Sequence, residues 1–136
     1  MKPEQFIREF GVDKAREVLE IVPENEHYFT NVMIKPCGNW VYSQIARLTH
    51  HDGVKFNVSF KLLEEWKPKF VNLKDLKRLV ESVEIVELFD SIEGAKDAYK
   101  NGLGFHSILI GGYEIPIARL GDAIKDHESI YGGGDD

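Results

Sequence analysis

Apolar residues recur at two different spacings along this chain, and the change between them limits the folds available to it. Helical spacing, in which roughly every third or fourth residue is apolar, occurs toward both ends. Between His27 and Phe60, β-branched and aromatic residues dominate, as is typical of strands. We therefore predict an α+β fold, in which a small antiparallel sheet packs with about four to five short helices on one face.

The strongest helix signal follows Asn72, whose side chain can cap the first turn. A second helix is predicted to restart at Asp90 or Ser91 and to close at Asn101 and Gly102. The helix after Asn72 carries its apolar stripe at Leu76, Leu79, Val80, Val83 and Val86.

Three further helices are indicated at the two ends of the chain. Pro3 to Phe10 forms a short helix that Gly11 stops, and Asp13 can cap the next one. The last helix is predicted to place one stripe on the core: Ile117, Leu120, Ile124, His127 and Tyr131.

Strands are predicted in the aromatic middle of the chain. We predict one strand in each of three segments, residues 27–34, 39–51 and 54–60. Asp52 and Gly53 mark a hairpin turn between the last two strands. Alternation within residues 54–60 places Val54, Phe56, Val58 and Phe60 on the core. A second, smaller hairpin is predicted around Gly111 and Gly112.

The length of 136 residues fits one domain, which we expect to span residues 1–131, with residues 132–136 as a flexible tail. Cys37 is the only cysteine, so an internal disulfide is impossible and a reducing compartment is expected. The first ten residues are too charged for a signal peptide, and no apolar run is long enough to cross a membrane. We therefore expect a soluble, cytoplasmic protein.

Negative charge gathers in the second half. The net charge is −6, and from Val71 onward thirteen Asp or Glu stand against seven Lys or Arg. This excess disfavours direct nucleic-acid binding through a basic patch. Three glutamates recur at steps of three residues: Glu81, Glu84 and Glu87. This spacing spreads their side chains around a helix, so they do not form one carboxylate pair. They form either a solvated surface or a docking surface for Lys and Arg.

No complete catalytic or cofactor motif is present, and we expect neither a cofactor nor a metal site. Cys37 lies in a turn and has no histidine at a recognisable spacing. His50 and His51 are adjacent on a predicted strand and therefore point to opposite faces. His106 with Glu114 across the second hairpin is a conceivable acid/base pair.

Three stretches resemble a group of small, uncharacterised accessory proteins of tailed phages and prophages of Gram-negative bacteria. They are residues 6–24, 73–99 and 117–133, so the resemblance covers both ends and omits the middle. In that group a glycine pair often stands where this chain has Asp90, Ser91 and Ile92. The resemblance implies a phage gene product in a bacterial host's cytoplasm and carries no activity.

Three functions remain open from these observations. The first is a protein-binding module that docks on a host or phage protein, for instance as an inhibitor of a host defence protein. The second is a small enzyme that uses His50, His51, His106 or Cys37. The third is a self-associating protein, and a homodimer is compatible with the first as well. For the binding module we predict these contact residues: Glu81, Glu84, Glu87, Trp40, Tyr42 and Trp66.

Overall fold

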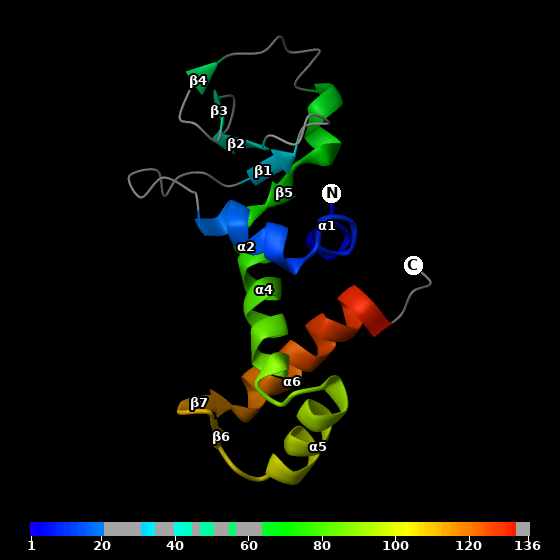
Figure 1. The fold of residues 1–136 in the computed structure, drawn as a ribbon, viewed down its shortest axis with the longest axis vertical. Helices are drawn as coiled ribbons and strands as arrows, with labels where there is room; N and C mark the ends of the chain where they lie inside the picture. Colours follow the sequence, from blue (N-terminus) through cyan, green and yellow to red (C-terminus); the bar gives the residue numbers. More distant parts are fainter. Residues whose placement is uncertain (21–30, 35–39, 45–46, 51–54, 57–63, 133–136) are drawn as a thin grey trace. The chain divides into compact units, whose positions relative to one another are not determined.

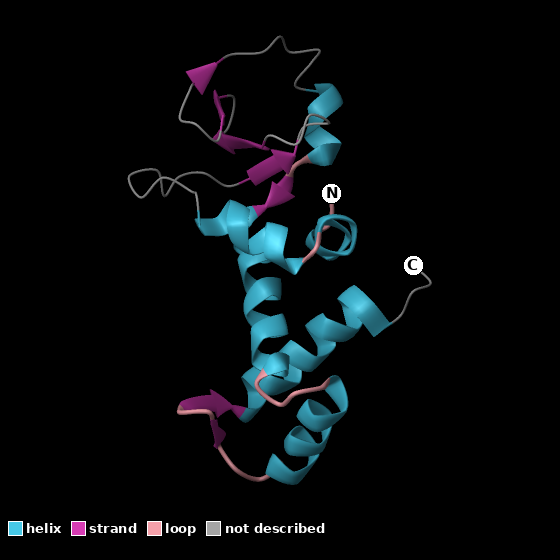
Figure 2. Cartoon of the chain, in the orientation of Figure 1, coloured by secondary structure: helices cyan, strands magenta, loops and turns pink. Residues whose placement is uncertain are grey.

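A computed structural model describes residues 1–20, 31–34, 40–44, 47–50, 55–56 and 64–132 (Figure 1). Its internal contacts divide the chain into two compact units, residues 1–77 and residues 78–136. The predicted α+β class is confirmed, since helices and antiparallel strands occur together (Figure 2). The predicted single domain stays a prediction, and most of the predicted tail lies outside the described residues.

Two short helices open the first unit. Helix α1 (Pro3–Phe10) has the predicted bounds and ends at Gly11, whose φ of 89° suits glycine. Helix α2 (Val12–Glu20) begins one residue before Asp13. The predicted Asp13 cap is therefore wrong: Asp13 lies in the first turn and pairs with Arg16, with 2.9 Å between Oδ1 and Nη1. Both helices bury one face through Phe6, Ile7, Ala15 and Val18.

The described strands of the first unit form a five-stranded antiparallel sheet in the order β4-β3-β2-β1-β5. The strand predicted over residues 39–51 is instead two strands, because the chain reverses between Gln44 and Arg47, which pair with each other. The predicted pairing across Asp52 and Gly53 is confirmed by the antiparallel β3–β4 pair, although the turn itself lies outside the described residues. The strands are β1 (Asn31–Ile34), β2 (Trp40–Gln44), β3 (Arg47–His50), β4 (Lys55–Phe56) and β5 (Val71–Asn72).

Helix α4 (Leu73–Glu87) follows β5 directly, and its main part belongs to the second unit. Its predicted cap is confirmed, because the backbone N–H of Asp75 donates to Oδ1 of Asn72 at 3.0 Å. The whole predicted stripe is at most 5% exposed: Leu76, Leu79, Val80, Val83 and Val86. This helix therefore folds as its sequence periodicity requires.

The remaining elements of the second unit are helix α5 (Ile92–Gly102), strands β6 (Ser107–Ile110) and β7 (Tyr113–Pro116), and helix α6 (Ile117–His127), which ends in a π-helical turn (Glu128–Gly132). Ser91 caps α5 as predicted, since its Oγ accepts from the N–H of Gly94 at 3.0 Å. The predicted stripe of the last helix fails at Tyr131, which is 49% exposed while Ile130 is buried. Because the last turn is π-helical, α-helical spacing does not extend to it.

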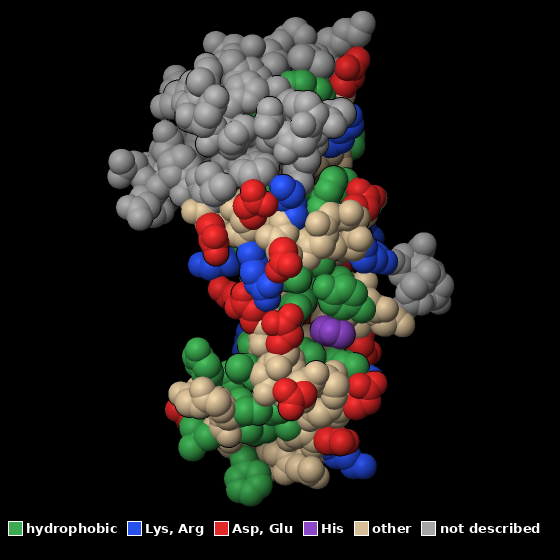
Figure 3. All heavy atoms as spheres, in the orientation of Figure 1, with side chains coloured by type: hydrophobic (Ala, Val, Ile, Leu, Met, Phe, Trp, Pro, Cys, Tyr) green, Lys and Arg blue, Asp and Glu red, His purple; other side chains and the backbone are tan. Residues whose placement is uncertain are grey.

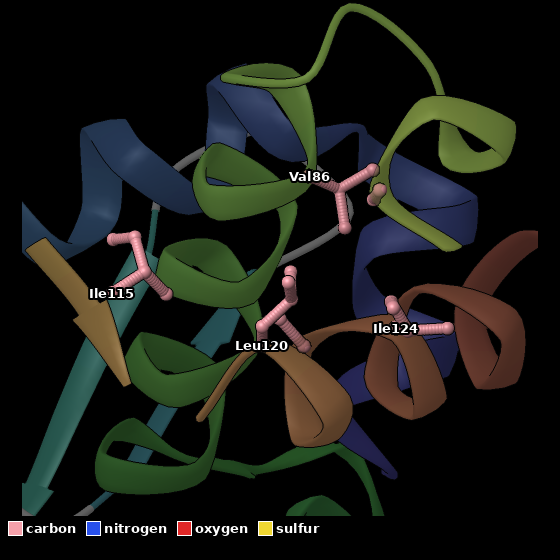
Figure 4. Packing of buried hydrophobic residues seen from close by; sticks show 6 residues of the cluster. Val86, Ile115, Leu120 and Ile124 are labelled. Carbon is pink, nitrogen blue, oxygen red and sulfur yellow. The ribbon is translucent and has the colours of Figure 1, made fainter. Parts of the chain in front are cut away.

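Side chains from α4, α5, β7 and α6 meet in the core of this unit, where those of Val86, Ile115, Leu120 and Ile124 point toward one another (Figure 4). Ala95 and Ala123 complete the buried cluster, and Ile108 and Ile110 of β6 pack against it. The core thus fixes α4, α6 and the hairpin to one another, and these three elements carry the candidate site.

Candidate functional site

The β6–β7 hairpin has one face on the core and one face in solvent. Its turn uses Gly111 and Gly112, with φ of 56° and 83°, which matches a two-residue turn that needs positive φ twice. Opposite residues of an antiparallel pair share a face, so Ile108 with Ile115 lies on the inner face and Leu109 with Glu114 on the outer face. Leu109 is consequently directed away from the core.

Four large apolar side chains are strongly exposed at this end of the unit. Leu103 and Phe105 precede β6 and are 58% and 70% exposed, while Leu109 and Tyr113 on the hairpin are 80% and 60% exposed. We call these four residues the hairpin patch, although Tyr113 pairs with Ile110 and so lies on the opposite face of the hairpin from Leu109. Apolar side chains gather over this part of the unit in Figure 3. Single exposed apolar residues are ordinary, whereas here four large ones lie within eleven consecutive residues.

A groove of about 350 Å³ lies between α4 and β7. Ile85 of α4 and Leu88, which directly follows this helix, line it together with Tyr113 and Ile115 of β7. Tyr113 therefore belongs to both the hairpin patch and this α4–β7 groove. The charged residues at the groove are Glu81, Glu84 and Arg119.

The three predicted glutamates divide between two places. Glu81 and Glu84 line the α4–β7 groove, whereas Glu87, one further step of three along the helix, does not. Steps of three drift by about 60° around an α-helix, so Glu87 stands about 120° from Glu81. The charge of Glu87 acts instead on His127 of α6.

Desolvation by burial lowers the pKa of His127 below its ordinary value. The negative charges of Glu128, Glu87 and Glu93 oppose this shift, while Lys96 adds to it. The imidazole stacks on Tyr131 with 4.8 Å between ring centroids. This is the packed, structural histidine that its position on the apolar stripe predicts.

A buried polar network joins α4 to α6. Ser82 is 0% exposed, and its Oγ donates to Oδ2 of Asp126 at 2.6 Å. Arg119 Nη1 donates to the same Oγ at 3.0 Å, and Arg78 Nη2 lies 3.3 Å from Oδ1 of Asp126. We call Ser82, Arg78, Arg119 and Asp126 the Ser82 network. The buried hydroxyl of Ser82 both donates and accepts within the unit, as burial requires.

The predicted aromatic contact residues belong to the first unit. Trp40 and Tyr42 lie on β2, and their side chains fall outside the description. Trp66 is half-buried in the first unit, directly before a 3-10 helix (Lys67–Lys69). Their part in binding stays a prediction.

The histidines and the cysteine show no catalytic arrangement among the described residues. The backbone O of His106 accepts from the N–H of Ile117, whereas Glu114 is opposite Leu109 and accepts from Ser107 Oγ at 2.7 Å. His50 lies on β3, while Cys37 and His51 lie outside the described residues. In the described part, no group of three His, Cys, Asp or Glu residues is placed to hold a metal ion.

Sequence reasoning missed the hairpin patch and the Ser82 network. A signal for Leu109 existed, because it alternates with Ile108 and Ile110 and a two-stranded hairpin covered on one face must expose the other. Ser82 and Asp126 are forty-four residues apart, so no local pattern connects them.

No family model, curated protein or solved structure matches this chain. In addition, none of the described helices combines the length and the apolar character that crossing a membrane requires.

Proposed function

We propose that this chain is a protein-binding module that docks its partner on the hairpin patch and the adjoining α4–β7 groove. The observation that carries the proposal is the exposure of Leu103, Phe105, Leu109 and Tyr113, each at least 58% accessible, on a unit that has its own buried core. Burying such side chains against a partner is favourable by about 25 cal/mol per Å² of apolar area. Rings and aliphatic side chains of this kind are typical binding anchors.

The charge around the groove defines the chemistry of the partner. Glu81 and Glu84 place two carboxylates beside an apolar floor made by Ile85, Leu88 and Tyr113. A complementary segment presents apolar side chains to the floor and Lys or Arg to the carboxylates. The partner is therefore expected to be a protein segment with basic and apolar residues. The positive charge of Arg119 should repel a Lys or Arg of the partner at the part of the groove that Arg119 lines.

The resemblance of both ends of the chain to phage and prophage accessory proteins supplies the cellular context of the proposal. In that context the partner is a host or phage protein in the bacterial cytoplasm, and a host defence protein is one such target. The enzyme and self-association hypotheses remain its alternatives.

The test is capture by crosslinking with matched variants. A photoreactive amino acid at Phe105 in the tagged full chain is activated in infected cells, and the crosslinked proteins are identified. We expect one protein that Leu109→Ser combined with Tyr113→Ser removes, since both side chains are largely exposed and the fold does not depend on them.

The matched control is Phe10→Ser, which removes an exposed ring from the first unit. It should leave the crosslinked protein unchanged. If the double variant captured the same protein as strongly as the unaltered chain, the hairpin patch would not be the docking surface.

A further inference from the structure

A second hollow of the C-terminal unit, of about 300 Å³, is lined by charged side chains from α4 and α6. They are Arg78, Arg119, Asp122, Lys125 and Asp126. Its volume is at the lower end of the range for small-molecule sites. Three cations and two carboxylates thus line one hollow of a chain whose second half is strongly acidic.

Arg119 is held in place at this hollow. Since Ser82 Oγ donates its single hydrogen to Asp126, it can only accept from Arg119 Nη1, at 3.0 Å. Nη2 of Arg119 approaches the backbone O of Arg78 at 3.5 Å. A guanidinium has five N–H donors, so donors remain for a ligand on a side chain that is already ordered. Prior ordering lowers the entropic cost of binding.

The charges that line the hollow do not cancel. Asp126 faces Arg78, which neutralises it, and the side chain of Asp126 is only 14% exposed. Within the described residues, the acceptors of Arg119, Ser82 Oγ and the backbone O of Arg78, are neutral, and Lys125 forms no ion pair. Arg119 and Lys125 are therefore two cations beside one remaining carboxylate, Asp122.

We propose that this hollow binds the phosphate group of a small molecule, either inorganic phosphate or a phosphate monoester. Arg119 donates from its fixed guanidinium, and Lys125, six residues further along α6, supplies the second positive charge that lines the hollow. Donors on two separate side chains suit a tetrahedral dianion better than a flat carboxylate. Asp122 opposes binding and limits the affinity.

The experiment is an NMR titration of the full chain with inorganic phosphate and, separately, with glycerol phosphate, at constant ionic strength. We expect chemical-shift changes that saturate with phosphate concentration at the backbone amides of Ser82, Arg119 and Lys125. Lys125→Gln should weaken binding at least about fivefold, since each unit of anion charge at contact distance in water is worth about that factor. Asp122→Asn should strengthen binding by a similar factor.

The control is Lys100→Gln, which makes the same change of charge on α5, away from the hollow. It should leave binding unchanged. Tighter binding of glycerol phosphate than of phosphate identifies an ester as the ligand, and the reverse identifies the free ion. Three results would overturn the proposal. They are an equal effect of Lys125→Gln and Lys100→Gln on phosphate affinity, chemical-shift changes that do not saturate, and acetate that binds as tightly as phosphate. Leu109→Ser should not affect the titration, so this variant separates the hollow from the hairpin patch, although Arg119 lines both the hollow and the α4–β7 groove.

Discussion

Ser82 shows how one small side chain determines the arrangement of several charges. It is fully buried, yet its hydroxyl both donates to Asp126 and accepts from Arg119. Burying a hydroxyl costs little free energy when it both donates and accepts a hydrogen bond. Its removal leaves one carboxylate and one guanidinium without a hydrogen-bond partner.

Replacing Ser82 by alanine is therefore expected to lower the free energy of unfolding by about 1–3 kcal/mol. Urea denaturation followed by circular dichroism measures this loss. Ser129→Ala is the control, because its exposed hydroxyl bonds only to the backbone O of Asp126 at 2.7 Å, and it should cost much less. Equal losses in the two variants would mean that the Ser82 network contributes no stability of its own.

His127 makes stability depend on pH in a defined direction. Burial lowers its pKa in the folded chain below the ordinary value of 6.5 that the unfolded chain retains. The unfolded state then binds more protons below pH 6.5, so stability falls as the pH drops through this value toward the folded pKa. Denaturation from about pH 7.5 to about pH 5 should show a steeper loss for the unaltered chain than for His127→Gln. Parallel curves would contradict this assignment.

At the scale of elements, the turn between α4 and α5 contains a backbone position that glycine would fill better. Asp90 has a φ of 68°, which costs an ordinary L residue about 1 kcal/mol. The structure explains why glycine suits the position.

Asp90→Gly is accordingly expected to raise the free energy of unfolding by up to about 1 kcal/mol, and Asp90→Ala to lower it by a similar amount. Thermal denaturation of both variants measures the difference. The expected order of stability is the glycine variant first, then the unaltered chain with Asp90, then the alanine variant. Equal stability of the two variants would show that the turn is not strained.

Elements with a strong local signal were predictable from the sequence. Four features follow from neighbouring residues alone. They are the bounds of α1, the Asn72 cap and apolar stripe of α4, the Ser91 cap of α5, and the glycine turn of the β6–β7 hairpin. The reversal between β2 and β3 was not predictable, because residues 44–47 contain none of the glycine, asparagine or aspartate that mark a tight turn. Strand β5 was missed because two residues carry no periodicity.

The candidate site was predictable only in part, for a related reason. Glu81 and Glu84 were identified from charge spacing, but their grouping with Tyr113 depends on how α4 packs against the hairpin. The exposure of Leu109 required the register of β6 on β7. Contacts between elements that are distant in sequence leave no mark in local patterns.

At the scale of the whole molecule, net charge and the hairpin patch oppose each other. Copies of a chain with a charge of −6 repel one another, while the patch favours contact between copies. Salt screens the repulsion, with a Debye length of about 10 Å at 0.1 M and about 3 Å at 1 M. Light scattering should therefore show more self-association as salt is raised, and Leu109→Ser should reduce it. A monomer under all these conditions would count against the self-association hypothesis.

Strand β5 links two events in the folding of this chain. Its backbone pairs with β1, about 40 residues earlier, so the sheet closes only after a long loop has been ordered. The same Asn72 that ends the strand and pairs with Asn31 also caps α4 through its side chain. The edge strand can therefore join the sheet only once residue 72 has been made, and this one residue both completes the sheet's edge and provides the start of the next helix.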